Sequence, residues 1–504
     1  MKKYSDYMDE ITADELYEGL LAYGMFSEKL PPIFTSEQFY DYCSSFTENN
    51  FSNNEHDYIN FDVMRNKNIP RQIGIPNPMA YQKLCSVLKD NWNKIQQHFH
   101  NYTDSDSNII SRIHIRKLKD TKSLFKMNYN NWRIDGTPED DLIIGKKFLV
   151  CADISNFFHS IYSHSLCWAL VGKNKSKSNR RDGWYNDIDF MCRNLQNGET
   201  HGVMIGPHTS NLLSEIILTV IDRKLSDSGF EYIRYIDDYR CYTSSQEKAQ
   251  EFLICLNNEF KAFDLSINDQ KTYIEKLPIP ATENWVRTLR NFDLLGSYNK
   301  VTYSKVKDYI DLAIELMKFN NNNSSIINYV FKVLYKKELT DNAKKYCIKR
   351  SINLAIIYHY LLPLMDDFVF TQYNADKNII ENFANIIYEE SFKNFNYEGI
   401  CYTIYYSLKY GFHLKSIDAS KIIKMDSCLA KLFGMLYYKK YGNKKDFKLF
   451  RDDAKALKET DMDRNWIYVY ETLTFGNLCG EWKNLKKAGI SFLKTEFNQM
   501  KFFN

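Results

Sequence analysis

The sequence lacks the features that mark secreted, disulfide-bonded and membrane proteins. Its 11 cysteines are odd in number and scattered, and none belongs to a CxxC pair. No apolar run approaches the roughly 20 residues of a membrane-spanning helix, and the first segment, MKKYSDYMDEITADELYEGL, turns acidic without an apolar signal core. These absences exclude a disulfide framework and a CxxC-type zinc site, and they predict a cytoplasmic protein with free thiols.

The chain also lacks any His and Cys cluster with metal-ligand spacing and any strict sequence repeat. Its 504 residues are too many for one ordinary core, and 44% hydrophobic with 26% charged residues indicate a globular protein of several domains. Residues 301–504 carry 31 basic and 23 acidic side chains, whereas residues 1–300 carry 35 and 40. The basic second half is compatible with a polyanionic partner, and a solvated lysine surface is the alternative.

Two segments of the first half combine short strands with acidic ends. Residues 146–152, KKFLVCA, form an apolar run typical of a buried strand, and Asp153 follows directly. Residues 230–243, FEYIRYIDDYRCYT, predict two strands joined at Asp237 and Asp238. From about residue 300 the periodicity is helical, with polar breaks such as FNNNNSS, and it predicts a stack of helix pairs.

Asp153, Asp237 and Asp238 are the candidate catalytic and metal-binding residues. Nucleotidyl transfer needs two metal ions about 3.5–4 Å apart, held by carboxylates on rigid strands. Magnesium prefers oxygen ligands and keeps several waters, so two or three carboxylates suffice. An acidic pair at a turn is by itself more often a solvated turn former, so the assignment depends on the segments around it.

The order of four short segments supplies that context. DISNFF contains Asp153, GVMIGPHTS precedes a long helix, RYIDDY holds the acidic pair, and INDQKT comes last. This order resembles the palm motifs A, B, C and D of reverse transcriptases, with Tyr235-Ile236-Asp237-Asp238 as the YxDD box. The resemblance implies an α+β fingers and palm domain over residues 1–300. It also implies an all-α, HEAT-like helical-repeat domain over residues 301–504 in place of a thumb.

The resemblance implies a role for each matching residue. The three aspartates would bind two Mg²⁺ ions, for which Mn²⁺ can substitute. Lys271 would protonate or neutralise the leaving pyrophosphate, Phe158 would exclude the ribose 2′-hydroxyl, and the arginines would bind the triphosphate with their forked guanidinium groups. The nucleotide-binding candidates are Phe158, Gly206, Pro207, Lys271, Arg71, Arg112 and Arg116. A core position for Phe158 and surface positions for Lys271 and the arginines are the alternatives.

Longer strings are similar to the abortive-infection (Abi) reverse transcriptases of bacterial phage defence. These strings are DISNFFHSIYSHSLCWALVGK, SNRRDGW and GETHGVMIGPHTSNLLSEI. One departure from templated members lies in motif B, where Met204 and Ile205 stand in place of the usual proline and glutamine. Resemblance and departure together imply a nucleotidyltransferase that builds DNA from dNTPs without a template, starting from its own hydroxyl group. A templated RNA-directed DNA polymerase of a retron-like or other defence element is one alternative, and a binding scaffold with an inactive palm is another.

The Abi resemblance also implies partners. It predicts a homo-oligomer, a trimer or hexamer, held together by the helical domains, and a single-stranded DNA product attached covalently to the protein. No membrane partner is expected. The priming group would most simply be a tyrosine of the N-terminal region, and the sequence does not choose among Tyr4, Tyr7, Tyr17, Tyr23, Tyr40 and Tyr42.

Overall fold

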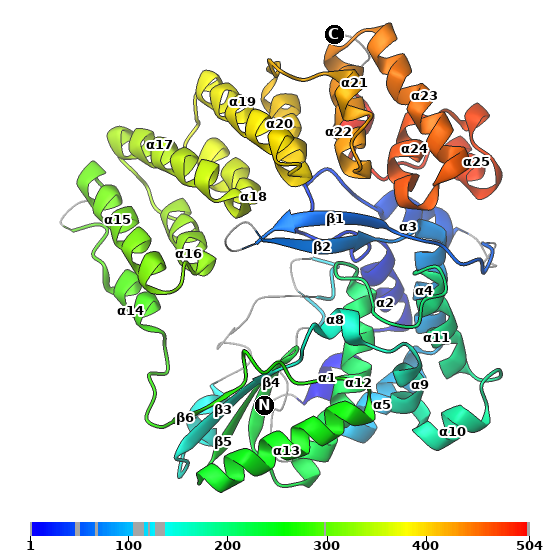
Figure 1. Ribbon diagram of the computed structural model, residues 1–504, viewed down its shortest axis with the longest axis vertical. Coiled ribbons are helices and arrows are strands. Elements are labelled where there is room, and N and C mark those ends of the chain that lie inside the picture. The colour runs from blue at the N-terminus through cyan, green and yellow to red at the C-terminus, as the bar shows by residue number, and fades with distance from the viewer. Residues whose placement is uncertain are drawn as a thin grey trace.

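The computed structural model describes residues 3–45, 51–65, 69–103, 115–118, 121–125, 137–296 and 299–500. Figure 1 shows three parts: a four-stranded sheet with helices packed on it, a two-stranded hairpin, and an array of helices that arches over both. No helix in the described ranges has the length and apolar character that crossing a lipid bilayer requires. All eleven cysteines are free thiols.

The four-stranded sheet is antiparallel throughout, in the order β4–β5–β3–β6. Its strands are β3 (Phe148–Asp153), β4 (Tyr232–Tyr235), β5 (Asp238–Thr243) and β6 (Tyr273–Lys276). Because successive side chains of a strand point to opposite faces, Val150 and Ala152 join the main core, whereas Leu149 and Tyr235 belong to a small cluster on the other face. The predicted buried strand before Asp153 and the predicted strand–turn–strand are both confirmed.

Helices cover the core-facing side of this sheet. The helices of this half are α1 (Tyr4–Asp9), α2 (Ala13–Leu21), α3 (Glu37–Ser44), α4 (Pro78–Asp90), α5 (Trp92–Thr103), α7 (Pro138–Leu142), α8 (Phe157–Ser160), α9 (His164–Val171), α10 (Lys173–Ser178), α11 (Trp184–Asn194), α12 (His208–Asp227) and α13 (Gln246–Ala262). Helix α13 contacts β3 and β5, and α12 packs against α5, α9 and α13. Local signals start these helices: Asn77 caps α4 ahead of Pro78, and Thr12 and Glu15 form the capping box of α2.

The hairpin consists of β1 (Ile59–Met64) and β2 (Pro70–Ile75), paired antiparallel with Ile59 opposite Ile75. Its core-facing side chains, such as Phe61 and Ile73, are buried. The backbone N–H of Gly74 donates to the carbonyl of Ile205, at 2.9 Å. The hairpin is therefore attached to the segment that leads into α12.

The described residues of the second half are mostly helical, as predicted, with isolated bridges at Val301–Leu339 and Phe34–Leu493. Its helices are α14 (Asn284–Asn291), α15 (Tyr303–Phe319), α16 (Ser324–Tyr335), α17 (Asp341–Ile357), α18 (Leu362–Met365), α19 (Lys377–Lys393), α20 (Tyr397–Tyr410), α21 (Ala419–Ile422), α22 (Cys428–Tyr441), α23 (Lys444–Thr460), α24 (Trp466–Thr472), α25 (Gly480–Lys487) and α26 (Thr495–Asn498). Near neighbours in sequence pack together: α15 against α16 and α17, α19 against α20, α20 against α22, and α22 against α24. Helix α14 packs on α15 and α16, so the array begins before residue 301.

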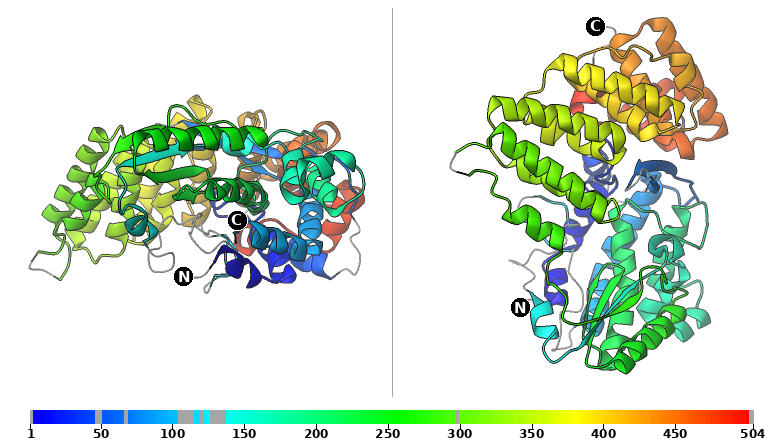
Figure 2. Two further views of the ribbon diagram at one scale, coloured as in Figure 1. Left: turned by 90° about the horizontal axis from the view of Figure 1, so that it is seen from below. Right: turned by 60° about the vertical axis from the view of Figure 1, so that its left-hand side comes forward.

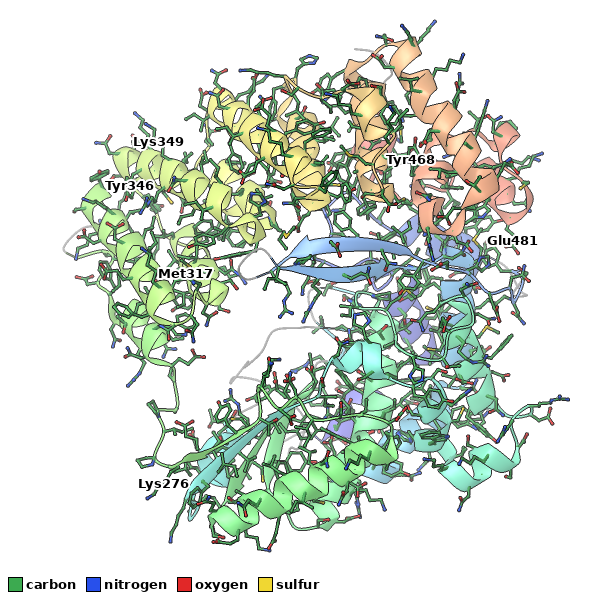
Figure 3. All side chains as sticks on the ribbon, viewed as in Figure 1. Lys276, Met317, Tyr346, Lys349, Tyr468 and Glu481 are labelled. Carbon is green, nitrogen blue, oxygen red and sulfur yellow. The ribbon has the colours of Figure 1, made fainter. Side chains whose placement is uncertain are left out.

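The helical array returns to the first half at several points. Strand β1 contacts α20, and the backbone N–H of Met64 donates to the Glu398 carboxylate, at 2.6 Å. Near the end of the chain, the backbone N–H of Thr35 donates to the carbonyl of Phe492, at 3.0 Å. Glu481 of α25, marked in Figure 3, accepts from the backbone N–H of Ser52, at 3.0 Å. Figure 2 shows the array bending over the hairpin from a second direction.

Candidate active site

The three predicted aspartates lie together at the ends of neighbouring strands. Asp153 is the last residue of β3, and Asp238, the first residue of β5, is its partner across the strand pair. Asp237 lies in the turn between β4 and β5, and its carbonyl accepts from the backbone N–H of Ile154, at 3.3 Å. Ile236 precedes it with φ of 56°, a left-handed conformation that is unusual for a β-branched residue. The structure therefore brings the three carboxylates to one edge of the sheet.

Asp153 is buried, and both of its carboxylate oxygens have donors. Asn268 Nδ2 donates to Oδ1 at 2.8 Å, and Lys271 Nζ pairs with Oδ2 at 2.6 Å. Although partial desolvation opposes it, the bond with Asp153 raises the pKa of Lys271. Lys271 is thus a protonated neighbour of the carboxylates, as its predicted role requires. Asn268 was not predicted from the sequence. Its only sequence signal is its place in INDQKT, three residues before Lys271.

The other two carboxylates, those of Asp237 and Asp238, have raised pKa values. Desolvation, and then the nearby charge of Asp153, raise the pKa of Asp237, while the positive charges of Lys271 and Arg71 oppose that rise. Desolvation, a hydrogen bond with Asp153 and the charge of Asp237 raise the pKa of Asp238 to about 6. Like charges held this close disfavour one another's ionised forms, so the cluster is one that a cation would stabilise.

The donor set fits magnesium in chemistry, because all three side chains present carboxylate oxygens. Among the residues that the structure describes, no three His, Cys, Asp or Glu side chains are assembled as a metal-holding group. In this arrangement the Lys271 ammonium is the cation against Asp153. If the chain holds a divalent ion here, Asp153, Asp237 and Asp238 are the side chains that would bind it.

The candidates of motifs A and B lie in segments that a backbone hydrogen bond joins at Phe158. Phe158 is half-buried, its ring lies 5.2 Å from that of Phe157, and its carbonyl accepts from the backbone N–H of Val203, at 2.7 Å. Gly206 has φ of 133°, and a Cβ there would lie 2.9 Å from Ile73 Cγ2. Only glycine therefore permits this approach to β2. Pro207 is buried and stands at the N-cap of α12.

The motif B departure has a structural counterpart. Met204 is buried, and a Cβ built on Gly74 would lie 2.7 Å from Met204 Cγ, so Met204 packs directly on the backbone of β2. The carbonyl of Ile205 accepts from Gly74 N. Neither side chain offers an amide, so neither can hydrogen-bond to a base or a nucleotide as glutamine can.

The three predicted arginines have different surroundings. Arg71 of β2 is near enough for its charge to act on the pKa values of Asp237, His159 and Lys29. It therefore belongs to the rim of the aspartate cluster. Arg116 is buried, with its guanidinium 5.5 Å from the centre of the Tyr7 ring, which connects it to α1. Arg112 lies outside the described residues.

The tyrosine candidates belong to α1, α2, α3 and the segment between α2 and α3. Tyr4 is buried, and its hydroxyl donates to Glu215 Oε2 at 2.8 Å. The buried Tyr17 hydroxyl accepts from Gln82 Nε2 at 2.9 Å. The other candidates, each half-buried, are Tyr7, Tyr23, Tyr40 and Tyr42.

A cavity of about 500 Å³ opens beside Asp238 on the sheet face opposite the main core. Its polar lining comes from Tyr235, Arg240, Gln270, Lys271 and Tyr273. Glu139 of α7 accepts a hydrogen bond from the Tyr235 hydroxyl at the same face. The cavity therefore joins the carboxylates to a surface with two cationic side chains, suited to a phosphate-bearing ligand.

Comparison with known proteins shows which family part of the chain is similar to. Residues 71–306 match the family described as "Reverse transcriptase (RNA-dependent DNA polymerase)". Among solved structures, one match is titled "Structure of apo telomerase from Candida Tropicalis", with 11% sequence identity, a TM-score of 0.34, and coverage of 71% of this chain and 70% of that one. No curated protein sequence matches the chain.

Proposed function

We propose that the chain is an abortive-infection DNA polymerase. The premise is that residues 71–306 are a reverse transcriptase domain and that the chain is a nucleotidyltransferase of this type. The chain extends DNA from dNTPs without a template and starts from a hydroxyl of the protein itself. The observation that carries the untemplated part is the packing of Met204 and Ile205 against β2. Because neither side chain has an amide, motif B cannot hydrogen-bond to the nascent base pair as the usual glutamine would.

The residues of the site have complementary tasks in this reaction. The attacking hydroxyl loses its proton to water, and its oxygen forms a bond to the α-phosphorus of the dNTP as the bond from that phosphorus to pyrophosphate breaks. Bound at the aspartates, two Mg²⁺ ions, or Mn²⁺ in their place, supply the Lewis acidity that such a displacement needs. Lys271 gives its proton to the leaving pyrophosphate, and Arg71 binds the triphosphate with its forked donors. Phe158 contacts the sugar at its 2′ position.

The helical array supports the assembly part of the proposal. Consecutive helices pack in sequence order, as in HEAT-like repeats, and such stacks leave a long surface free for partners. We assign residues 301–504, with α14, to a scaffold that joins copies of the chain into a trimer or hexamer. Its excess of basic residues would hold the single-stranded DNA product through phosphate contacts. The free thiols agree with action in the cytoplasm.

The decisive experiment omits nucleic acid altogether. Purified protein is incubated with Mg²⁺ and labelled dNTPs alone, and the product is run on a denaturing gel with and without proteinase treatment. We expect label that migrates with the protein and is released by the protease, and none with Asp237→Asn. Single Tyr→Phe changes at the six candidate positions then identify the priming hydroxyl, because one of them abolishes attachment.

A templated RNA-directed polymerase is the second candidate, and the family match itself favours it. In that case the nucleotide-only reaction gives no product, and addition of an RNA template with a primer restores synthesis. Product that separates cleanly from the denatured protein would reject self-priming and leave the templated function.

A further inference from the structure

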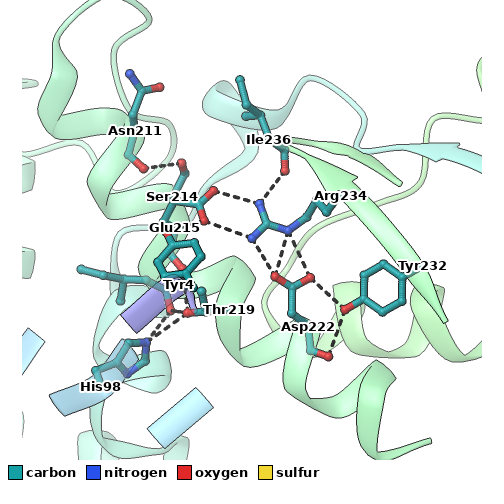
Figure 4. A network of polar contacts seen from close by, with 11 residues as sticks. Tyr4, His98, Asn211, Ser214, Glu215, Thr219, Asp222, Tyr232, Arg234 and Ile236 are labelled. Carbon is teal, nitrogen blue, oxygen red and sulfur yellow. Dashed lines mark hydrogen bonds and ion pairs between the residues drawn. The ribbon is translucent and has the colours of Figure 1, made fainter. Parts of the chain in front are cut away.

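A buried ion cluster lies directly behind the turn that carries Asp237 and Asp238. Arg234 of β4 is 0% exposed and pairs with two carboxylates of α12. Its Nη1 lies 2.8 Å from Glu215 Oε1, and its Nη2 lies 2.7 Å from Asp222 Oδ2. Figure 4 shows the guanidinium between the two carboxylates, which are seven residues apart on one face of the helix.

The same guanidinium also holds the catalytic turn. Arg234 Nη1 donates to the carbonyl of Ile236 at 2.9 Å. Ile236 is the residue with the left-handed backbone conformation, and Asp237 follows it. A β-branched residue keeps such a conformation only where its surroundings over-determine it. The bond from Arg234 is a contact that does so, because it fixes the direction of the peptide group that leads into Asp237.

The N-terminal helix closes the cluster from the other side. The Tyr4 hydroxyl donates to Glu215 Oε2, the oxygen that also accepts from Arg234 Nη2 at 3.1 Å. The Tyr4 ring packs on Phe99 of α5, with ring centroids 5.4 Å apart, and α1 lies along α5. Arg234 is the single guanidinium paired with both Glu215 and Asp222, so the Tyr4 hydroxyl supplies Glu215 with a further donor.

We propose that Arg234, Glu215 and Tyr4 are positioning residues of the polymerase site, and that α1 is a structural part of that site. The chain of contacts runs from α1 through Glu215 and Arg234 to Ile236, and so to the metal-binding turn. A forked guanidinium can contact both carboxylates and the carbonyl together, whereas the ammonium of lysine is a point donor that cannot. Loss of the Tyr4 contact or of the Arg234 contact lets the turn relax, and Asp237 then binds metal less well.

This proposal gives Tyr4 a role different from priming. Its hydroxyl is buried against Glu215 and donates its proton there. A positioning hydroxyl changes how fast each nucleotide is added and how much metal is needed. It does not decide whether the DNA is attached to the protein.

The test compares Tyr4→Phe and Arg234→Lys with the unaltered chain. Nucleotide incorporation is measured against Mg²⁺ concentration, both with dNTPs alone and with an added template and primer, so that the test does not depend on self-priming. We expect the Mg²⁺ concentration for half-maximal rate to rise and kcat to fall, by about tenfold each, with the KM for dNTP nearly unchanged. Tyr406→Phe is the matched control, because it removes another buried hydroxyl bond, to the Leu362 carbonyl, in the helical array.

Two outcomes overturn the proposal. One is a Tyr4→Phe protein whose Mg²⁺ dependence equals that of the unaltered chain and of Tyr406→Phe. The other is a Tyr4→Phe protein that loses protein-attached product but extends an added primer normally, which would make Tyr4 the priming residue. Should Arg234→Lys fail to fold, Tyr4→Phe alone still decides between these results.

Discussion

The two halves of the chain use their buried polar groups in opposite ways. Around the four-stranded sheet, two buried groups lie close to the Asp237–Asp238 turn: Arg234 binds two carboxylates and the Ile236 carbonyl, and Asp153 binds the exposed Lys271. In the helical half, several buried tyrosine hydroxyls donate to backbone carbonyls, as Tyr406 does to Leu362 and Tyr468 does to Phe450. The first arrangement fixes the turn that carries Asp237 and Asp238, and the second joins helices to one another.

Asp366 makes the contrast sharp, because it is a buried carboxylate of the helical half. It accepts from the Tyr405 hydroxyl at 2.5 Å, from Lys409 Nζ at 2.6 Å and from the Tyr410 hydroxyl at 2.5 Å. Three donors thus satisfy this one carboxylate. At the sheet edge, by contrast, three carboxylates compete for Lys271 and its surroundings. Three neighbouring carboxylates, in addition to burial, therefore distinguish the sheet cluster from Asp366.

The largest expected effect comes from replacing an aspartate of the sheet cluster and comparing the result with replacement of Asp366. Asp153→Asn or Asp237→Asn removes a metal-binding charge and should lower the rate of nucleotide incorporation by about 10³-fold or more. Circular dichroism and thermal unfolding should show an intact fold. The matched variant Asp366→Asn should do the reverse, lowering stability by about 1–3 kcal/mol with little change in rate. Equal rates for Asp153→Asn and Asp366→Asn would remove the assignment of the site.

Glu398 connects the two halves, and it supplies the next largest effect. Its side chain is 1% exposed and accepts from Met64 N of the hairpin. Desolvation raises the pKa of Glu398 from 4.5 to about 8. Because the folded pKa is raised, stability is fully present below about pH 4.5 and is lost as pH rises toward 8. We expect the unfolding free energy to fall by a few kcal/mol over that range.

Glu398→Gln should remove this pH dependence, since glutamine keeps an acceptor for Met64 N without a charge. The unfolding free energies of the variant and the unaltered chain should agree near pH 5 and diverge by pH 8.5, with the variant more stable. Denaturant unfolding at a series of pH values measures the difference. Glu338→Gln, on an exposed side chain, is the control. Parallel curves for all three proteins would show that Glu398 titrates normally.

The candidate site could be predicted from sequence because its signals are local. Strand-ending Asp153, the Asp237–Asp238 turn and Lys271 each lie in a short segment whose order identifies it. The supports of the site could not be predicted. Arg234 meets Glu215 only after a strand returns along α12, and Tyr4 comes from 211 residues away in sequence. Spacing carries no information about such pairings.

The fold likewise divides into local elements that the sequence predicts and long-range contacts that it does not. Helical periodicity after residue 300 predicted the helices but not that α20 would hold β1, since Glu398 and Met64 are 334 residues apart. The β1–β2 hairpin itself was not predicted, because the prolines of IPRQIGIPNP argue against a strand paired within a sheet. Pro70 is the first residue of β2, opposite Met64 at the end of the pair, a position that proline tolerates.

The smallest predicted effect concerns selectivity rather than rate. Phe158 is half-buried beside motif B, whereas its neighbour Phe157 is buried in the core. If the Phe158 ring contacts the 2′ position of the sugar, Phe158→Ala should raise the use of ribonucleotides relative to deoxyribonucleotides by about tenfold. The measurement is the ratio of kcat/KM for dATP and ATP. Phe157→Ala is the matched control, because it opens a core cavity and should lower stability without changing the ratio. A ratio that is the same in Phe158→Ala and Phe157→Ala would make Phe158 a packing residue and leave sugar choice to another side chain.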